Sequence, residues 1–201
     1  MNPIGIAGKI VYPFAMKTSL ILFIALQLAA CSTPPAINSQ AVPVAPGVNF
    51  SLLSPADLGR PIDAVQLVTA HHGSDTFVIE GRLSVTPDQI LMVGTDPLGN
   101  RIMSVRWSNH ILTVDKASWV PDILHPENIL ADVMMTYWPE ASVRHGLSGA
   151  SLEATPERHI QTNGKDVVVI SYDGDPWSGT THLKNLAWDY QIDVKSSMVI
   201  P

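Results

Sequence analysis

The chain has little of what most enzymes and nucleic-acid-binding proteins use. Its single cysteine, Cys31, excludes a disulfide within the chain, so the fold must be held by its core. Its 12 Lys and Arg residues form no cluster, which argues against binding of nucleic acid or of anionic lipid headgroups. It also lacks the Gly-x-Ser-x-Gly motif that exposes a nucleophilic serine and the glycine-rich loop that binds phosphate.

The seven histidines show no metal-binding spacing. No His-Glu-x-x-His motif occurs, and His71 and His72 are neighbours that would point to opposite faces of a strand. Asp173-Gly174-Asp175 lacks the later carboxylates of a calcium loop and is typical of a surface turn. The sequence therefore predicts a protein that is not an enzyme and carries no metal or other cofactor.

The N-terminal part of the chain has the three regions of a secretion signal. Lys17 supplies the positive charge, residues 20–26 form an apolar core, and the small residues Ala29 and Ala30 precede Cys31. The apolar run is shorter than the ~20 residues that a helix needs to span a bilayer. We therefore expect residues 1–30 to be a signal peptide, and translation from Met16 would give the same signal.

Leu28-Ala29-Ala30-Cys31 resembles the lipobox of bacterial lipoproteins. This resemblance implies cleavage before Cys31 and attachment of acyl chains such as palmitate to it, and two or more chains anchor a protein firmly. Ser32 stands where an aspartate would imply retention in the inner membrane. By the sorting rule of enterobacterial lipoproteins, we expect a lipid-anchored protein on the periplasm-facing side of the outer membrane.

The rest of the chain divides into a tether and one domain. Residues 32–47 are rich in Pro, Ala, Ser and Asn without apolar periodicity, so residues 31–48 are predicted to be the lipidated cysteine and a flexible tether. Residues 49–201 are enough for one domain with a core of its own. Cleavage before Cys31 would leave 18 acidic and 10 basic residues, a formal net charge of −8 instead of −6.

Most of the domain has the alternating pattern of strands. Residues 77–85, 103–107, 112–114 and 188–194 place apolar side chains on one face and polar side chains on the other. Ser108-Asn109-His110 predicts a tight turn. Asn163-Gly164 is a strong hairpin signal that joins residues 158–162 to residues 166–172. The pattern favours antiparallel strands.

One helical region interrupts the strands. Residues 127–138 carry apolar side chains at helical spacing after Pro126, Pro139 ends the helix, and residues 141–147 favour a second short helix. We therefore predict a mainly β (α+β) fold: a single, strongly curved antiparallel sheet, or half barrel, wrapped on a short helical lid. Such a sheet encloses an apolar cavity if the helix does not fill it. The residues expected to line this cavity are Phe77, Ile79, Leu83, Met103, Val105, Trp107, Met134, Trp138, Tyr190 and Ile192.

Four blocks of the chain, in this order, resemble the outer-membrane lipoprotein receptor family LolB and its carrier relative LolA. They are Asp96-Pro97-Leu98-Gly99, the helical region of residues 127–147, the hairpin of residues 158–172 and the closing hairpin of residues 183–194. The chain is more similar to an uncharacterised family of LolB-like lipoproteins that is often encoded beside aryl polyene synthesis genes. The resemblance implies an eleven-stranded half barrel with a helical lid and an apolar cavity for acyl chains.

The resemblance also implies a role for the loop of Pro97, Leu98 and Gly99, because the matching loop of LolB projects a leucine thought to help place cargo in the membrane. An ordinary turn with Leu98 folded inward is the alternative. Where LolB has a tryptophan-bearing Gly-Leu-Pro segment, this chain has His145-Gly146-Leu147. The cargo implied is therefore an acyl-chain-bearing amphiphile of open identity: a lipoprotein, a glycolipid or an aryl polyene lipid.

Two functions remain open from the sequence, and they rank above a periplasmic hydrolase, because the strand pattern places apolar residues in the cavity where a hydrolase would need carboxylates or His with Ser. The first is an anchored lipoprotein that binds or transfers such an amphiphile, with a periplasmic LolA-like carrier as partner. The second is a structural lipoprotein that scaffolds envelope proteins, with a filled core and an exposed apolar patch.

The lipid anchor can be tested at Cys31. We expect Cys31→Ser to leave the protein soluble or unprocessed, because no thioether can form. Fractionation after high salt and carbonate measures this, and recovery of the variant with the outer membrane would contradict lipid anchoring.

Overall fold

The structure is a computed structural model that describes residues 36–37, 41–120 and 125–199. All of these residues belong to one compact unit, residues 34–201. The expected signal peptide, Cys31 and the first part of the expected tether lie outside the described residues. Within the described part of the chain, no helix is both long and apolar enough to cross a membrane.

Eleven strands form one antiparallel sheet in the order β1-β8-β7-β6-β5-β4-β14-β13-β12-β11-β10. In chain order they are β1 (Ala36–Ile37), β4 (Ile62–His72), β5 (Asp75–Val85), β6 (Ile90–Thr95), β7 (Arg101–Ser108), β8 (Ile111–Lys116), β10 (Ser151–Ala154), β11 (Arg158–Thr162), β12 (Lys165–Asp173), β13 (Thr180–Asn185) and β14 (Tyr190–Met198). The edge strands β1 and β10 do not pair, so the sheet is open. The prediction of a mainly β fold with a large antiparallel sheet is confirmed.

A second, three-stranded sheet corrects two predictions. It consists of β2 (Ala41–Ala45), β3 (Val48–Ser51) and β9 (Leu147–Ser148), so the domain does not contain a single sheet. Val42 and Val44 are buried, which makes this part of the expected tether a strand of the folded domain. Pro43 hid the strand pattern, yet a proline is compatible with β2 because β2 is an edge strand.

Three helical segments are described: a short 3-10 helix, η1 (Pro55–Leu58), and the α-helices α1 (Pro126–Tyr137) and α2 (Glu140–Gly146). Pro126 lies in the first turn of α1, where a backbone N–H has no acceptor within the helix, so the N–H that proline lacks is not needed. Trp138, the residue before Pro139, is extended and ends the helix. Both predicted helices are therefore confirmed, with ends that differ by one residue.

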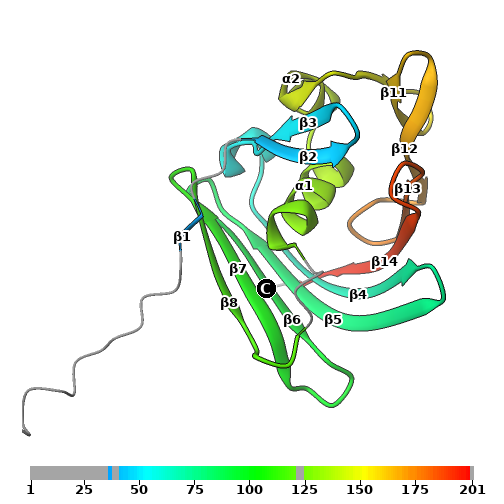
Figure 1. The fold of residues 1–201 in the computed structure, drawn as a ribbon. Coiled ribbons are helices and arrows are strands. Elements are labelled where there is room, and N and C mark those ends of the chain that lie inside the picture. Colours follow the sequence, from blue (N-terminus) through cyan, green and yellow to red (C-terminus); the bar gives the residue numbers. More distant parts are fainter. Residues whose placement is uncertain (1–35, 38–40, 121–124, 200–201) are drawn as a thin grey trace, which may run out of the picture. The chain divides into compact units, whose positions relative to one another are not determined.

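Helix α1 lies within the curve of the large sheet, and Figure 1 shows the sheet bending around it. Residues of α1 and of β4, β5, β6, β7, β13 and β14 line the same cavity. The apolar stripe of α1 divides into two faces. Ile129 and Val133 point to the large sheet, whereas the sulfur of Met134 accepts a hydrogen bond from Leu53 N, just after β3. The helix thus separates the two sheets.

The predicted turns have the expected backbone. Asn109 and His110 have φ of 51° and 59°, and Asn163 and Gly164 have φ of 51° and 72°, the left-handed conformation that a two-residue hairpin requires.

The last strand begins at Tyr190, so the prediction that it includes Trp188 is wrong. Asn185 Oδ1 accepts hydrogen bonds from the N–H groups of Ala187 and Trp188, which closes a turn there.

The C-terminus of α1 is held by side chains from the sheet. The last carbonyls of a helix have no partner within it. The Arg158 guanidinium donates to the carbonyls of Met135 (2.5 Å) and Trp138 (2.8 Å), and the Tyr172 hydroxyl donates to the carbonyl of Thr136 (2.8 Å). Burial lowers the pKa of Arg158, but arginine stays protonated because its ordinary pKa is so high. β11 and β12 therefore fix this end of the helix.

Arg158→Met tests this attachment. Methionine keeps most of the apolar stem but leaves two helix carbonyls without donors, so we expect the free energy of unfolding to fall by about 2–3 kcal/mol. Chemical denaturation measures the loss. Arg106→Met, at an exposed position of β7, is the control and should change stability little. Equal stability of the two variants would contradict a capping role for Arg158.

Candidate functional site

An apolar cavity of about 200 Å³ lies between α1 and the concave face of the large sheet. It exists because the underside of α1 does not fill the curve of the sheet. Its lining residues are Gln66, Val68 and Ala70 of β4; Ile79, Gly81, Arg82 and Leu83 of β5; Met92, Val93 and Gly94 of β6; Met103 and Val105 of β7; Ile129, Asp132, Val133, Thr136 and Tyr137 of α1; Thr181 and Leu183 of β13; and Ile192 and Val194 of β14.

Half of the residues predicted to line the cavity do so. They are Ile79, Leu83, Met103, Val105 and Ile192. Strand alternation identified the correct face of β5, β7 and β14 in each of these cases.

Three other predicted residues are fully buried in the packed core instead, so the prediction is wrong for them. Trp107 Nε1 donates to the Leu53 carbonyl (2.8 Å), and Trp138 Nε1 donates to the Ser54 carbonyl (3.1 Å). Met134 contacts the same segment. These side chains lie beyond the cavity or on the other face of α1, which a repeating pattern does not reveal.

The last two predicted residues are also not among the lining residues. Phe77 is on the cavity face of β5 but near the β4–β5 turn, where it is 38% exposed. Tyr190 points its hydroxyl at the Asp132 carboxyl, which does line the cavity. The alternation along each strand thus predicted which face of the sheet carries these two residues, but not how far they lie from α1.

Four polar side chains form a hydrogen-bonded group at the cavity wall near the C-terminus of α1. Gln66 Nε2 donates to the hydroxyls of Tyr137 (3.0 Å) and Ser196 (3.1 Å). The Tyr137 hydroxyl is 3.3 Å from the hydroxyls of Thr181 and Ser196. Burial raises the pKa of Tyr137, so it stays a neutral hydroxyl. Among the described residues, no fully buried side-chain N or O atom lacks a hydrogen bond.

Asp132 is the buried carboxyl of the cavity. It is 7% exposed, and each of its oxygens is 3.0 Å from the Tyr190 hydroxyl, which also accepts a hydrogen bond from Asn185 Nδ2 (3.2 Å). Burial raises the pKa of Asp132 to about 7, and the hydrogen bond from Tyr190 opposes this rise. Sequence reasoning missed Asp132. The available signal was its position three residues after Ile129, on the apolar stripe of the helix.

The size of the cavity limits what it can hold. An engineered apolar cavity of ~150 Å³ binds benzene, whereas pockets for drug-sized ligands measure roughly 300–1,000 Å³. A cavity of about 200 Å³ therefore fits a short segment of an aliphatic chain. Met92 and Met103 line it, and flexible thioether side chains can adapt to ligands of different shape.

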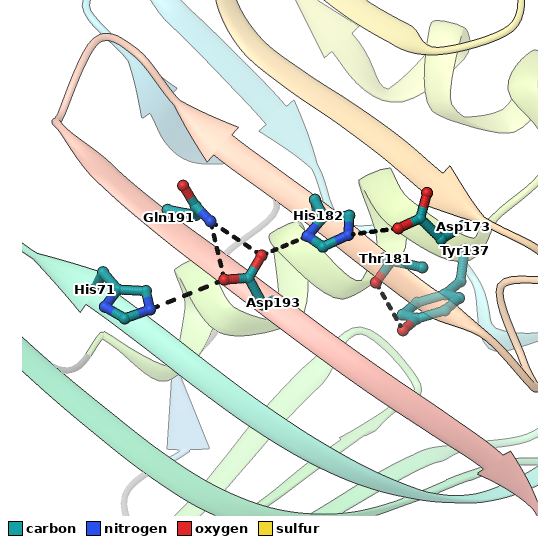
Figure 2. Close-up of polar contacts among 7 residues, drawn as sticks. All are labelled: His71, Tyr137, Asp173, Thr181, His182, Gln191 and Asp193. Carbon is teal, nitrogen blue, oxygen red and sulfur yellow. Dashed lines mark hydrogen bonds and ion pairs between the residues drawn. The ribbon is translucent and has the colours of Figure 1, made fainter.

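Strand β13 carries different chemistry on its two faces, as Figure 2 shows. Thr181 lines the cavity and contacts Tyr137, while the next residue, His182, points to the outer face of the sheet.

The outer face carries a row of ionisable side chains that crosses four strands (Figure 2). His182 Nδ1 is 2.5 Å from an Asp193 oxygen, His182 Nε2 is 3.2 Å from an Asp173 oxygen, and His71 Nε2 is 3.9 Å from Asp193. The hydrogen bond to Asp193 is the main reason why the pKa of His182 is raised. Among the described residues, no group of three His, Cys, Asp or Glu side chains is placed to hold a metal ion. This row cross-links β12, β13, β14 and β4.

The turn between β6 and β7 exposes Leu98 by 87%. Asp96 Oδ1 accepts hydrogen bonds from the N–H groups of Leu98 (2.9 Å) and Asn100 (2.8 Å), and the Asp96 carbonyl accepts one from Gly99 N (2.9 Å). Gly99 has φ of 83°, which favours glycine. Leu98 is therefore not folded inward, and the turn that carries it is held by its own hydrogen bonds.

The model of a family described as a protein of unknown function, DUF3261, matches residues 63–198, about two thirds of the chain. No protein with curated annotation matches the chain.

Proposed function

The chain belongs to the DUF3261 family of proteins of unknown function, and we propose that it binds the apolar chain of an amphiphile in the cavity beneath α1. The observation that carries this proposal is the cavity itself, which leaves about 200 Å³ of mostly apolar space inside a domain whose remaining core is packed. Apolar side chains beside unfilled space lack the contacts that a packed core gives them. A hydrocarbon chain in the cavity would supply such contacts.

The resemblance to the LolB and LolA families supports the same function. It implies an open, eleven-stranded half barrel around a helix, and the large sheet has eleven strands and lies around α1. On this proposal the protein is a lipoprotein, anchored through Cys31 at the periplasm-facing side of the outer membrane. Its cargo is a lipoprotein, a glycolipid or an aryl polyene lipid, and its partner is a periplasmic LolA-like carrier.

We also assign the exposed turn at Leu98 to contact with the membrane. Leu98 is 87% exposed, and Trp119, which is 60% exposed, follows β8 at the same end of the sheet. The hydrogen bond from Ala117 N to the Ile102 carbonyl places this segment beside the start of β7. A leucine and a tryptophan at one end of a sheet suit the interface of a bilayer, where tryptophan is enriched.

The scaffolding alternative has one supporting observation. Val65 (49% exposed) and Leu67 (46% exposed) lie on the outer face of β4 and could contact another protein. A scaffold does not need internal space, however, and the domain retains a cavity. The cavity therefore favours ligand binding.

Gly81→Leu tests the cavity. A Cβ at Gly81 would meet its nearest neighbours at 3.7–4.0 Å, so a leucine would enter the cavity without a clash at its first atom. We expect native mass spectrometry of detergent-free wild-type protein to detect bound or exchangeable lipid, and the variant to lose most of it while keeping its unfolding temperature. Ser84→Leu, on the outer face of β5, is the control. Lipid-free wild-type protein that takes up no added lipid would refute the proposal.

Leu98→Glu tests the membrane contact. Burial of a leucine is worth ~1.5–3 kcal/mol, and about 1.4 kcal/mol is a factor of ten, so we expect transfer of a fluorescent lipid to liposomes to slow about tenfold or more. Stability should not change, because Leu98 is a surface residue. Ile111→Glu is the matched control, since Ile111 is 46% exposed at the opposite end of β7 and β8. Normal transfer by a stable Leu98→Glu protein would exclude this role.

A further inference from the structure

The cavity contains a carboxyl group that a purely apolar ligand does not explain. Asp132 lies on the same face of α1 as Ile129 and Val133, and all three line the cavity. A carboxyl group in an apolar site costs free energy unless its hydrogen bonds are made. An aliphatic side chain at this position would pack against a hydrocarbon ligand without that cost.

The hydrogen bonds of Asp132 within the domain are incomplete. A carboxylate has about four lone-pair positions, but a tyrosine hydroxyl has one proton to donate. Tyr190 contacts both oxygens at 3.0 Å, so its single proton serves two acceptors. In the described part of the chain, no Lys or Arg side chain forms an ion pair with Asp132. The carboxyl group therefore retains acceptor positions beside the cavity.

This geometry defines the polar group that fits beside Asp132. An ammonium, hydroxyl or amide N–H group would donate to the carboxylate, and the ammonium would also neutralise its charge. A carboxylate or phosphate would be repelled. We propose, on the basis of the proposed lipid-binding function, that Asp132 makes the cavity selective for amphiphiles with a hydrogen-bond donor, above all an ammonium group, next to the apolar chain.

The selectivity for an ammonium group depends on pH. Asp132 has a pKa of about 7, whereas an alkylamine stays protonated well above that value. The titratable groups near it are Tyr137, which lines the cavity, and Tyr190, whose hydroxyl contacts Asp132. Burial raises the pKa of both phenols, so they stay neutral at pH 6–8. Arg82 contributes to the cavity wall, but its guanidinium binds Asp63. Asp132 is thus the group that changes charge.

The test compares three ligands with one chain length: decylamine, 1-decanol and decanoate. Binding to the purified, detergent-free full chain is measured by titration calorimetry at pH 8 and pH 6. At pH 8 we expect decylamine to bind at least tenfold more tightly than 1-decanol, and decanoate to bind most weakly. Between pH 8 and pH 6 the ionised fraction of Asp132 falls from about nine-tenths to about one-tenth, so decylamine binding should weaken about tenfold. Binding of 1-decanol should not change.

Asp132→Asn is the decisive variant, because its amide oxygen can still accept the hydrogen bond from Tyr190. It should bind decylamine and 1-decanol equally at both pH values. Since the raised pKa of Asp132 means that folding disfavours the charged form, wild-type stability should fall as the pH rises from about 4 to 7, and the variant should lack this loss. At pH 8 the variant should therefore unfold at a temperature at least as high as the wild-type protein, and this measurement shows that it is folded.

The outcomes separate the two proposals. Equal binding of decylamine and decanoate by the wild-type protein, or an amine preference that survives in folded Asp132→Asn, would overturn the role of Asp132 and leave the lipid-binding function intact. Absence of binding by all three ligands would overturn the lipid-binding function itself.

Discussion

The attachment of α1 at its two ends determines the rest of this structure. At its C-terminus, Arg158 and Tyr172 donate hydrogen bonds to carbonyls that the helix cannot satisfy. Near its N-terminus, Asn128 Nδ2 donates to the Pro43 carbonyl (2.8 Å) in β2. Side chains fix both ends of α1, and the face that carries Met134 packs on the segment after β3. The helix is therefore held in place even though its other face, which carries Ile129 and Val133, does not fill the space above the large sheet. The cavity follows from this arrangement.

The two faces of the large sheet carry different kinds of side chain: mostly apolar on the concave face and charged or polar on the outer face around His182. The concave face supplies apolar side chains to the cavity, together with a few polar groups that are hydrogen-bonded to one another. The outer face carries the charged row around His182, where water can solvate the ions. Alternation along each strand produces this separation, since Thr181 and His182 are neighbours in sequence and lie on opposite faces. The buried carboxyl of Asp132 is the exception to this rule, and it comes from the helix.

Local sequence patterns predicted both α-helices and the strands β5, β7, β8, β11, β12 and β14, but not how these elements pack on one another. Alternation assigned Ile79 and Leu83 to the cavity face, and Asn163-Gly164 gave the hairpin, because both signals depend on neighbouring residues. The strand β2 was missed because Pro43 interrupts its pattern. Trp107 and Trp138 were wrongly assigned to the cavity, because residues of the core and of a cavity wall are equally apolar in sequence. Only the three-dimensional packing distinguishes a core residue from a cavity residue. Asp132 was missed because a single polar residue on an apolar stripe does not reveal its partner 58 residues away.

The turn that carries Leu98 has a consequence for the rate at which it could meet a partner. Three hydrogen bonds to Asp96 already fix the backbone of the turn. Ordering a flexible loop on binding costs roughly 1–2 kcal/mol of conformational entropy per residue, and this turn would not incur that cost. Asn100 and the turn's N–H groups also hold the pKa of Asp96 below its ordinary value, so the carboxylate keeps these hydrogen bonds in mildly acidic surroundings. The turn is therefore preformed, and it holds Leu98 exposed without the help of any other part of the domain.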